Sequence, residues 1–192
     1  MIPIFVALFF IDAIPYHFAL SGVVFALACV TDFLDGHIAR KYKLVTNFGK
    51  FLDPIADKIL VSTALIVMLI PVGGVLLLPS YASIAVALIL ARELMISGFR
   101  MVSASRGLVL SADMSGKIKT VFQDVAIIVL LAGGSFFPET YSVMNIAGLV
   151  LLGIATILTV YSGAGYIIKN RHVLKDPAPR KDSESNGDEK KD

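Results

Sequence analysis

Long apolar runs separated by short polar connections make up most of this chain. The runs are continuously apolar rather than alternating, and they are longer than the roughly 10 residues of a membrane barrel strand. About 20 helical residues cross the hydrocarbon core of a bilayer. The pattern therefore predicts an all-α, polytopic membrane protein with six transmembrane helices. The six apolar runs are 2–14, 18–33, 51–72, 76–99, 118–132 and 143–168.

The first run is shorter than a complete span. It begins almost at Met1, with neither the basic leader nor the small-residue cleavage site of a signal peptide. We expect that a segment ahead of it is missing, so that the first helix is truncated. The alternative is a helix that tilts or lies partly in the membrane interface.

Composition agrees with a membrane protein and changes near the end of the chain. The 192 residues are 56% hydrophobic, with a mean hydropathy of +0.79, which is too apolar for an ordinary soluble domain. Residues 169–192 instead mix both charges with Pro, Ser, Asn and Gly. We expect a transmembrane catalytic domain over 1–168 and a disordered, charged cytoplasmic tail over 169–192. Cys29, the single cysteine, lies inside the second run and predicts packing rather than a disulfide or metal site.

The basic residues indicate an orientation. All 17 Lys and Arg lie in or beside the second-to-third connection, the fourth-to-fifth connection, or the tail. The opposite connections, 12–17, 71–79 and 133–141, contain none. By the positive-inside rule, the basic side and both termini face the cytoplasm, which requires an even number of spans. The predicted location is the plasma (inner) membrane.

Four aspartates gather where the second and third runs approach each other. Asp32 and Asp35 are three residues apart, and Asp53 and Asp57 are four apart. Each pair shares one face if its helix continues, and Pro54 is tolerated in a first helical turn. The short connection then lets the two pairs face each other. Four carboxylates this close repel strongly in a low dielectric, so a positive charge must lie between them.

Two sources of that positive charge are open. Structural salt bridges would use basic residues of the same connection. Alternatively, divalent cations would occupy the gap, because carboxylate oxygens suit hard ions such as Mg²⁺ or Mn²⁺. Two cations about 4 Å apart can clamp the entering and leaving oxygens of a phosphoryl displacement. The second interpretation predicts phosphate chemistry at the membrane surface. The basic residues of the first are Arg40, Lys41, Lys50 and Lys58.

Small residues and one arginine lie between the acidic pairs. Gly36, Ala39 and Gly49 would let a nucleotide or phosphate approach the backbone closely. The planar guanidinium of Arg40 suits phosphate oxygens. Taken singly, the same residues are explained by a helix end, a loop glycine and an interfacial arginine.

Together these residues resemble the signature of the CDP-alcohol phosphatidyltransferase family, with eight specified positions over 26 residues. The resemblance implies a six-helix membrane bundle, usually a homodimer, that transfers a phosphatidyl group from a CDP-linked lipid to an alcohol and releases CMP. It implies that Asp57 is the general base and lies near two Mg²⁺ or Mn²⁺ ions. The implied metal ligands are Asp32, Asp35, Asp53 and Asp57, and the implied CDP-binding residues are Asp32, Gly36, Ala39, Arg40 and Gly49.

The second half of the chain resembles the branch of this family that uses CDP-diacylglycerol and glycerol 3-phosphate. The similarity lies in AREL at 91–94, GFR at 98–100, and GKIKT followed by Q at 116–123. A group of cations would suit an acceptor that carries its own phosphate. Lys117 and Lys119 are two residues apart and cannot both face one ligand, and Lys119 is the weaker candidate. The alternative for each is positive-inside anchoring. The implied acceptor-phosphate residues are Arg92, Arg100, Lys117 and Lys119.

Two other functions stay open. A sister transferase would use inositol phosphate, phosphatidylglycerol or serine as acceptor. A cation transporter would place ionisable groups near the midplane of several spans, whereas here they gather at one membrane face, with only Asp124 deeper. The resemblance also implies a polar interfacial helix ahead of the first span; we expect this segment to be missing here, which would leave part of the CDP site undefined. The expected partners are CDP-diacylglycerol, glycerol 3-phosphate, membrane lipids and a second copy of the chain, with no nucleic acid.

Overall fold

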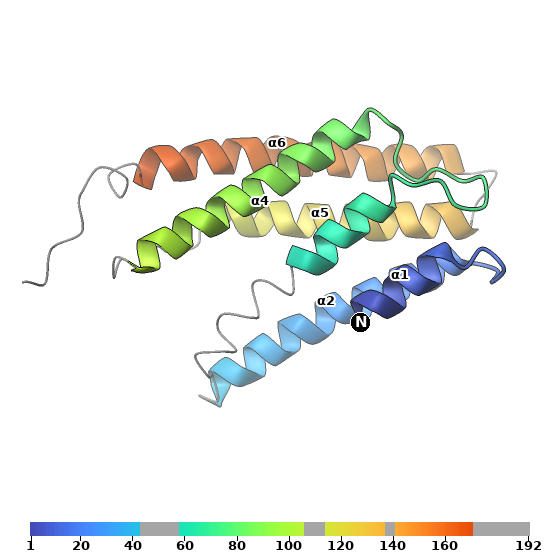
Figure 1. Ribbon diagram of the computed structural model, residues 1–192, viewed down its shortest axis with the longest axis horizontal. Helices are drawn as coiled ribbons and strands as arrows, with labels where there is room; N and C mark the ends of the chain where they lie inside the picture. Colours follow the sequence, from blue (N-terminus) through green and yellow to red (C-terminus); the bar gives the residue numbers. More distant parts are fainter. Residues whose placement is uncertain (43–57, 106–113, 137–140, 171–192) are drawn as a thin grey trace, which may run out of the picture.

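The computed structural model describes residues 1–42, 58–105, 114–136 and 141–170, and the helices lie side by side along its long axis (Figure 1). Over these residues the regular structure is helical apart from an isolated bridge between Val72 and Val75. The all-α prediction is therefore confirmed for the described part. The helices are α1 (Ile2–Phe10), α2 (His17–Lys41), the segment Lys58–Val67, α4 (Ala82–Ser105), α5 (Met114–Phe136) and α6 (Tyr141–Asn170).

Three of the described helices are long and apolar enough to cross a membrane. They contain the spans Ala82–Ser103, Gly116–Phe136 and Val143–Lys169. The apolar helices His17–Asp32 and Lys58–Val67 are shorter, and α1 has 9 residues. A 9-residue helix is about 14 Å long, roughly half of the hydrocarbon core. The length and apolar composition of these helices indicate an integral membrane protein. Six spans remain a prediction.

Helix α2 continues well past the predicted end of its apolar run at residue 33, as far as Lys41. Asp32 and Asp35 therefore lie inside a continuous helix rather than at its end. By contrast, α4 begins later than predicted, at Ala82. Residues 71–81 turn instead, since Gly73 and Gly74 adopt positive φ and Val72 pairs with Val75.

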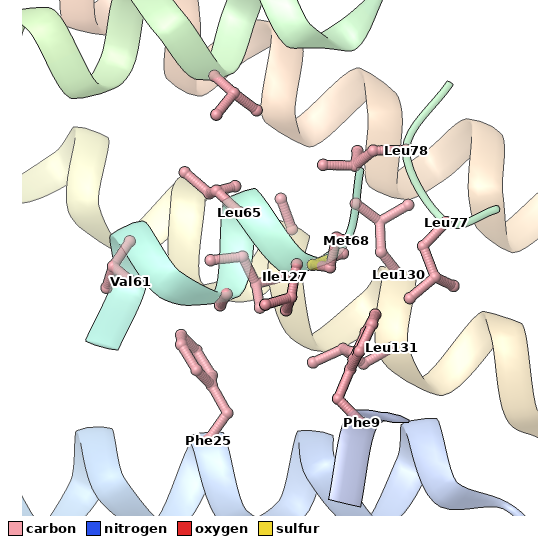
Figure 2. Packing of buried hydrophobic residues seen from close by; sticks show 14 of the residues in the cluster. Phe9, Phe25, Val61, Leu65, Met68, Leu77, Leu78, Ile127, Leu130 and Leu131 are labelled. Atoms are coloured by element: carbon pink, nitrogen blue, oxygen red, sulfur yellow. The ribbon is translucent and has the colours of Figure 1, made fainter. Parts of the chain in front are cut away.

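The buried core lies between α1, α2, the segment Lys58–Val67 and α5 (Figure 2). Phe9 and Phe25 enter it from α1 and α2, and Leu65 and Ile127 enter it from the facing elements. Large apolar side chains also point outward, with Leu94 of α4 75% exposed and Ile157 of α6 70% exposed. Apolar side chains on the outside of long apolar helices are expected where lipid is the solvent.

Helices α5 and α6 pack against each other more extensively than any other described pair. Glycines allow this close approach. A Cβ atom on Gly148 would lie 2.5 Å from Cγ of Leu130, and one on Gly133 would lie 3.0 Å from Cβ of Met144. In membranes, where apolar burial does not drive helices together, such close packing contributes much of the association.

Hydroxyl groups inside the helices are satisfied within their own helix. Several donate to the carbonyl oxygen four residues earlier, which completes the hydrogen bonding of the hydroxyl proton without a partner helix. These pairs are Thr31 to Leu27, Ser97 to Glu93, Ser103 to Phe99, Thr120 to Gly116, Thr156 to Leu152 and Thr159 to Ala155.

Candidate active site

Asp32 and Asp35 line the same cavity beside α2. Asp32 is half-buried and Asp35 is exposed. The prediction that these two carboxylates share a helix face is therefore confirmed. The cavity has a volume of about 240 Å³ and also contacts α1 and the segment Lys58–Val67. Its lining residues are Met1, Ile2, Ala28, Cys29, Thr31, Asp32, Asp35 and Leu60.

The other residues of the signature are only partly described. Gly36, Ala39 and Arg40 belong to the last turns of α2, so Gly36 does not end that helix. Gly49, Asp53 and Asp57 lie outside the described residues. The facing arrangement of the two acidic pairs therefore remains a prediction.

The described part of this cavity fits a divalent cation in its chemistry. Two carboxylates on one wall supply the hard oxygen ligands that Mg²⁺ and Mn²⁺ prefer. Within residues 1–42, 58–105, 114–136 and 141–170, no group of three or more His, Cys, Asp or Glu residues could hold a metal by itself. Asp32 and Asp35 would therefore make up part of a ligand set.

A second charged cluster lies inside the bundle, where α4, α5 and α6 meet. One carboxylate oxygen of Glu93, Oε1, accepts hydrogen bonds from Nζ of Lys119 at 2.8 Å and from Nη1 of Arg92 at 2.9 Å. Lys119 is only 2% exposed. A charge this deeply buried is tolerated when it is paired, and Glu93 supplies the pairing.

Gly163 of α6 makes room for the Arg92 side chain, which also lies beside Gly116 of α5. The Nη2 atom of Arg92 donates to Oγ of Ser162 on α6 at 3.0 Å. A Cβ atom on Gly163 would lie 3.0 Å from Cγ of Arg92, and one on Gly116 would lie 3.6 Å from Nη2. Arg92 thus passes between α5 and α6 and connects both helices to α4.

Lys58, the first residue of the segment Lys58–Val67, extends this cluster. Its ammonium group donates to Oγ of Ser97, and that hydroxyl donates to the backbone carbonyl of Glu93. Beside them lies a cavity of about 20 Å³, room for about one water molecule. Gln123 lines it, and Oε1 of Gln123 is buried with no hydrogen-bond partner among the described residues.

The remaining predicted cations lie at the edge of this cluster. Arg100 is exposed; its Nε donates to the hydroxyl of Tyr166 at 3.3 Å, and its guanidinium carbon lies 5.5 Å from the centre of that ring. Lys117 is exposed on α5, whereas Lys119 points into the bundle. The prediction that Lys117 and Lys119 lie on different faces is confirmed.

The sequence reasoning did not single out Glu93, Ser97 or Ser162. A signal for Glu93 was present, because an acidic residue within an apolar run requires a partner. Its partner is Lys119, 26 residues away in the sequence, and that pairing depends on how α4 packs against α5.

The chain matches a known protein family along most of its length. Residues 1–161 match the family model described as CDP-alcohol phosphatidyltransferase. The chain belongs to the CDP-alcohol phosphatidyltransferase family. Members of this family are generally dependent on a divalent metal, which agrees with the carboxylates of α2.

Several curated relatives of this phosphatidyltransferase carry similar names. A CDP-diacylglycerol–glycerol-3-phosphate 3-phosphatidyltransferase of Bacillus subtilis is 41% identical over 165 residues, which cover 85% of this chain and 80% of the relative. A protein of the same name from Rickettsia bellii is 39% identical and covers 86% of both chains. A probable phosphatidylglycerophosphate synthase of Mycobacterium tuberculosis is 36% identical, over 88% of this chain and 75% of the relative.

Proposed function

We propose that this phosphatidyltransferase transfers the phosphatidyl group of CDP-diacylglycerol to glycerol 3-phosphate, forming phosphatidylglycerophosphate and CMP. The observation that carries the proposal is the name shared by relatives that align with most of the chain at 39–41% identity. The complete eight-position signature between Asp32 and Asp57 supports the same reaction class.

The proposed metal ligands are Asp32, Asp35, Asp53 and Asp57, with Mg²⁺ or Mn²⁺ as the ion and a two-metal site as the arrangement. Asp32 and Asp35 support this assignment because they line one cavity. When bound, two such cations would neutralise the diphosphate of the lipid substrate and the charge of the departing CMP.

The proposed CDP site uses the end of α2 and the connection that follows it. The small residues of this stretch would allow the nucleotide to lie close to the backbone, and the guanidinium of Arg40 would pair with diphosphate oxygens. The residues assigned to CDP are Asp32, Gly36, Ala39, Arg40 and Gly49.

The proposed acceptor-phosphate site uses Arg92 and Arg100 of α4 with Lys119 of α5, because Lys117 is exposed on a different face of α5. Arg92 and Arg100 both reach α6, through Ser162 and Tyr166 respectively, which supports their position on one face of α4. A phosphate dianion requires several positive charges near it, whereas serine or free inositol would require fewer.

In the proposed reaction, Asp57 takes the proton from the hydroxyl group of glycerol 3-phosphate. The oxygen of that hydroxyl attacks the β-phosphorus of CDP-diacylglycerol in line. A phosphorus–oxygen bond to the new alcohol forms while the bond to the CMP oxygen breaks, and CMP leaves with the electron pair. Arg40 stabilises the negative charge on the leaving phosphate.

The proposed setting is the inner membrane, with six spans and the active site and both termini in the cytoplasm. The distribution of Lys and Arg supports this orientation. A homodimer is proposed from the family resemblance.

The experiment that tests the function measures CMP release and lipid product from labelled CDP-diacylglycerol in mixed micelles. Separate reactions contain glycerol 3-phosphate, inositol phosphate, phosphatidylglycerol or serine. We expect phosphatidylglycerophosphate in the first reaction alone, loss of turnover with a chelator, and recovery with Mg²⁺ or Mn²⁺. Turnover with another acceptor and not with glycerol 3-phosphate would overturn the assignment.

A further inference from the structure

Glu93 is an acidic residue inside a span, and the reaction proposed above gives it no role. Its carboxylate lies among positive groups from three elements: Lys119 of α5, Arg92 of α4, and the Lys58–Ser97 hydrogen bond that ends on the Glu93 carbonyl. Through Arg92 the same cluster reaches Ser162 of α6. Glu93 thus connects Lys119 and Arg92 through its carboxylate, and Lys58 through Ser97 and its backbone carbonyl.

Glu93 is the main group that holds Lys119 and Arg92 in place. Lys119 is buried, and Nε of Arg92 is buried without a hydrogen-bond partner among the described residues. The side chains of Glu93 and Arg92 are 19% and 16% exposed, and the adjoining cavity of about 20 Å³ has room for about one water molecule, so water would only partly replace a lost carboxylate. Without that negative charge, two cations that share one oxygen would repel each other and move apart.

From this arrangement we infer that Glu93 is a positioning residue, which holds Lys119 and Arg92 in the geometry that serves the acceptor phosphate. The inference rests on the proposed function, because it assigns these two cations to glycerol 3-phosphate. A neutral residue at position 93 would leave the buried Lys119 without its carboxylate partner and would disturb the acceptor site.

The first test is a steady-state comparison of Glu93→Gln and Glu93→Asp with the wild type. Glu93→Gln keeps the shape of the side chain and removes its charge. We expect the KM for glycerol 3-phosphate to rise by about 10- to 100-fold, because small displacements of binding groups have effects of this size. The KM for CDP-diacylglycerol should stay unchanged, and Glu93→Asp, which keeps the charge, should recover part of the loss.

The second test is a double-mutant cycle between Glu93→Gln and Lys119→Met, followed in kcat/KM for glycerol 3-phosphate. If Glu93 acts through Lys119, the two losses will not add, because the groups are in direct contact. Thr159→Val, which alters a buried hydroxyl bonded within α6, controls for general disturbance of the bundle and should keep wild-type constants.

Equal changes in both KM values, an unchanged KM for glycerol 3-phosphate, or additive losses in the double-mutant cycle would overturn the inference. If Glu93→Gln does not fold, the KM values for both substrates are measured instead in Glu93→Asp and in the Glu93→Gln/Lys119→Met double variant, which lacks both buried charges. A wild-type enzyme that uses another acceptor would reject the proposed function instead, and the Glu93–Lys119 coupling would then be measured with that acceptor.

Discussion

The proposed chemistry depends on Asp57 more than on any other single side chain. Replacing it by Asn keeps the size of the side chain but removes the group that takes the proton. We expect kcat for CMP release to fall by about 10²- to 10⁴-fold, the usual contribution of a general base. The measurement is CMP release at saturating concentrations of both substrates, with binding of CDP-diacylglycerol followed separately and expected to remain.

The matched control is Asp12→Asn, the same substitution at an exposed residue of the connection between α1 and α2. It should leave kcat unchanged. Wild-type kcat in the Asp57 variant would contradict the assignment of the base.

The sequence predicts which helix face a side chain occupies better than it predicts whether that side chain is buried. The spacing of Asp32 and Asp35 was sufficient to predict a shared face, because both lie on one helix. Spacing also separated Lys117 from Lys119, but it could not predict which of them is buried. Lys119 points inward because Glu93 of α4 receives it, and contacts between helices are not contained in the periodicity of either one.

At the scale of helices, the fit of α6 against α5 depends on Gly148. An added Cβ atom would lie 2.5 Å from Cγ and 2.6 Å from Cδ2 of Leu130. Gly148→Ala should therefore destabilise the protein by about 1–3 kcal/mol, the usual cost of overpacking. The measurement is thermal unfolding in detergent, where the midpoint temperature should fall.

Gly153→Ala on the same helix is the control. Among the described residues, no atom beyond its own stretch of helix lies within 4 Å of the added Cβ. The midpoint should therefore be unchanged or slightly higher, because alanine favours the helix over glycine. A lower midpoint in this variant and not in Gly148→Ala would contradict the described packing of α5 and α6.

Helix type was easier to predict than helix length. Apolar runs indicated the positions of α4, α5 and α6. Hydropathy could not predict that α2 continues through polar residues to Lys41. Hydropathy also placed residues 76–81 in a helix. They form part of a turn because Gly73 and Gly74 direct the chain away from helical geometry.

For the whole molecule, the distribution of basic residues predicts a testable topology. Two single-cysteine variants, Ser80→Cys and Lys169→Cys, are made in a Cys29→Ser background. Position 80 lies in a connection without Lys or Arg, and position 169 lies at the end of α6. A membrane-impermeant maleimide should label Ser80→Cys in intact bacterial cells and Lys169→Cys only after permeabilisation, because the basic side faces the cytoplasm. Labelling in the opposite order would invert the proposed orientation.

The pairing of Lys119 with Glu93 also bears on the order in which the protein is assembled in the membrane. Chains are synthesised from the N-terminus, so α4 is made before α5. The hydroxyls described above enter the bilayer already bonded within their own helices. The ammonium of Lys119, by contrast, depends on another helix, and the carboxylate that receives it is present before α5 is made. The order of charges along the chain thus spares the nascent protein an unpaired cation in lipid.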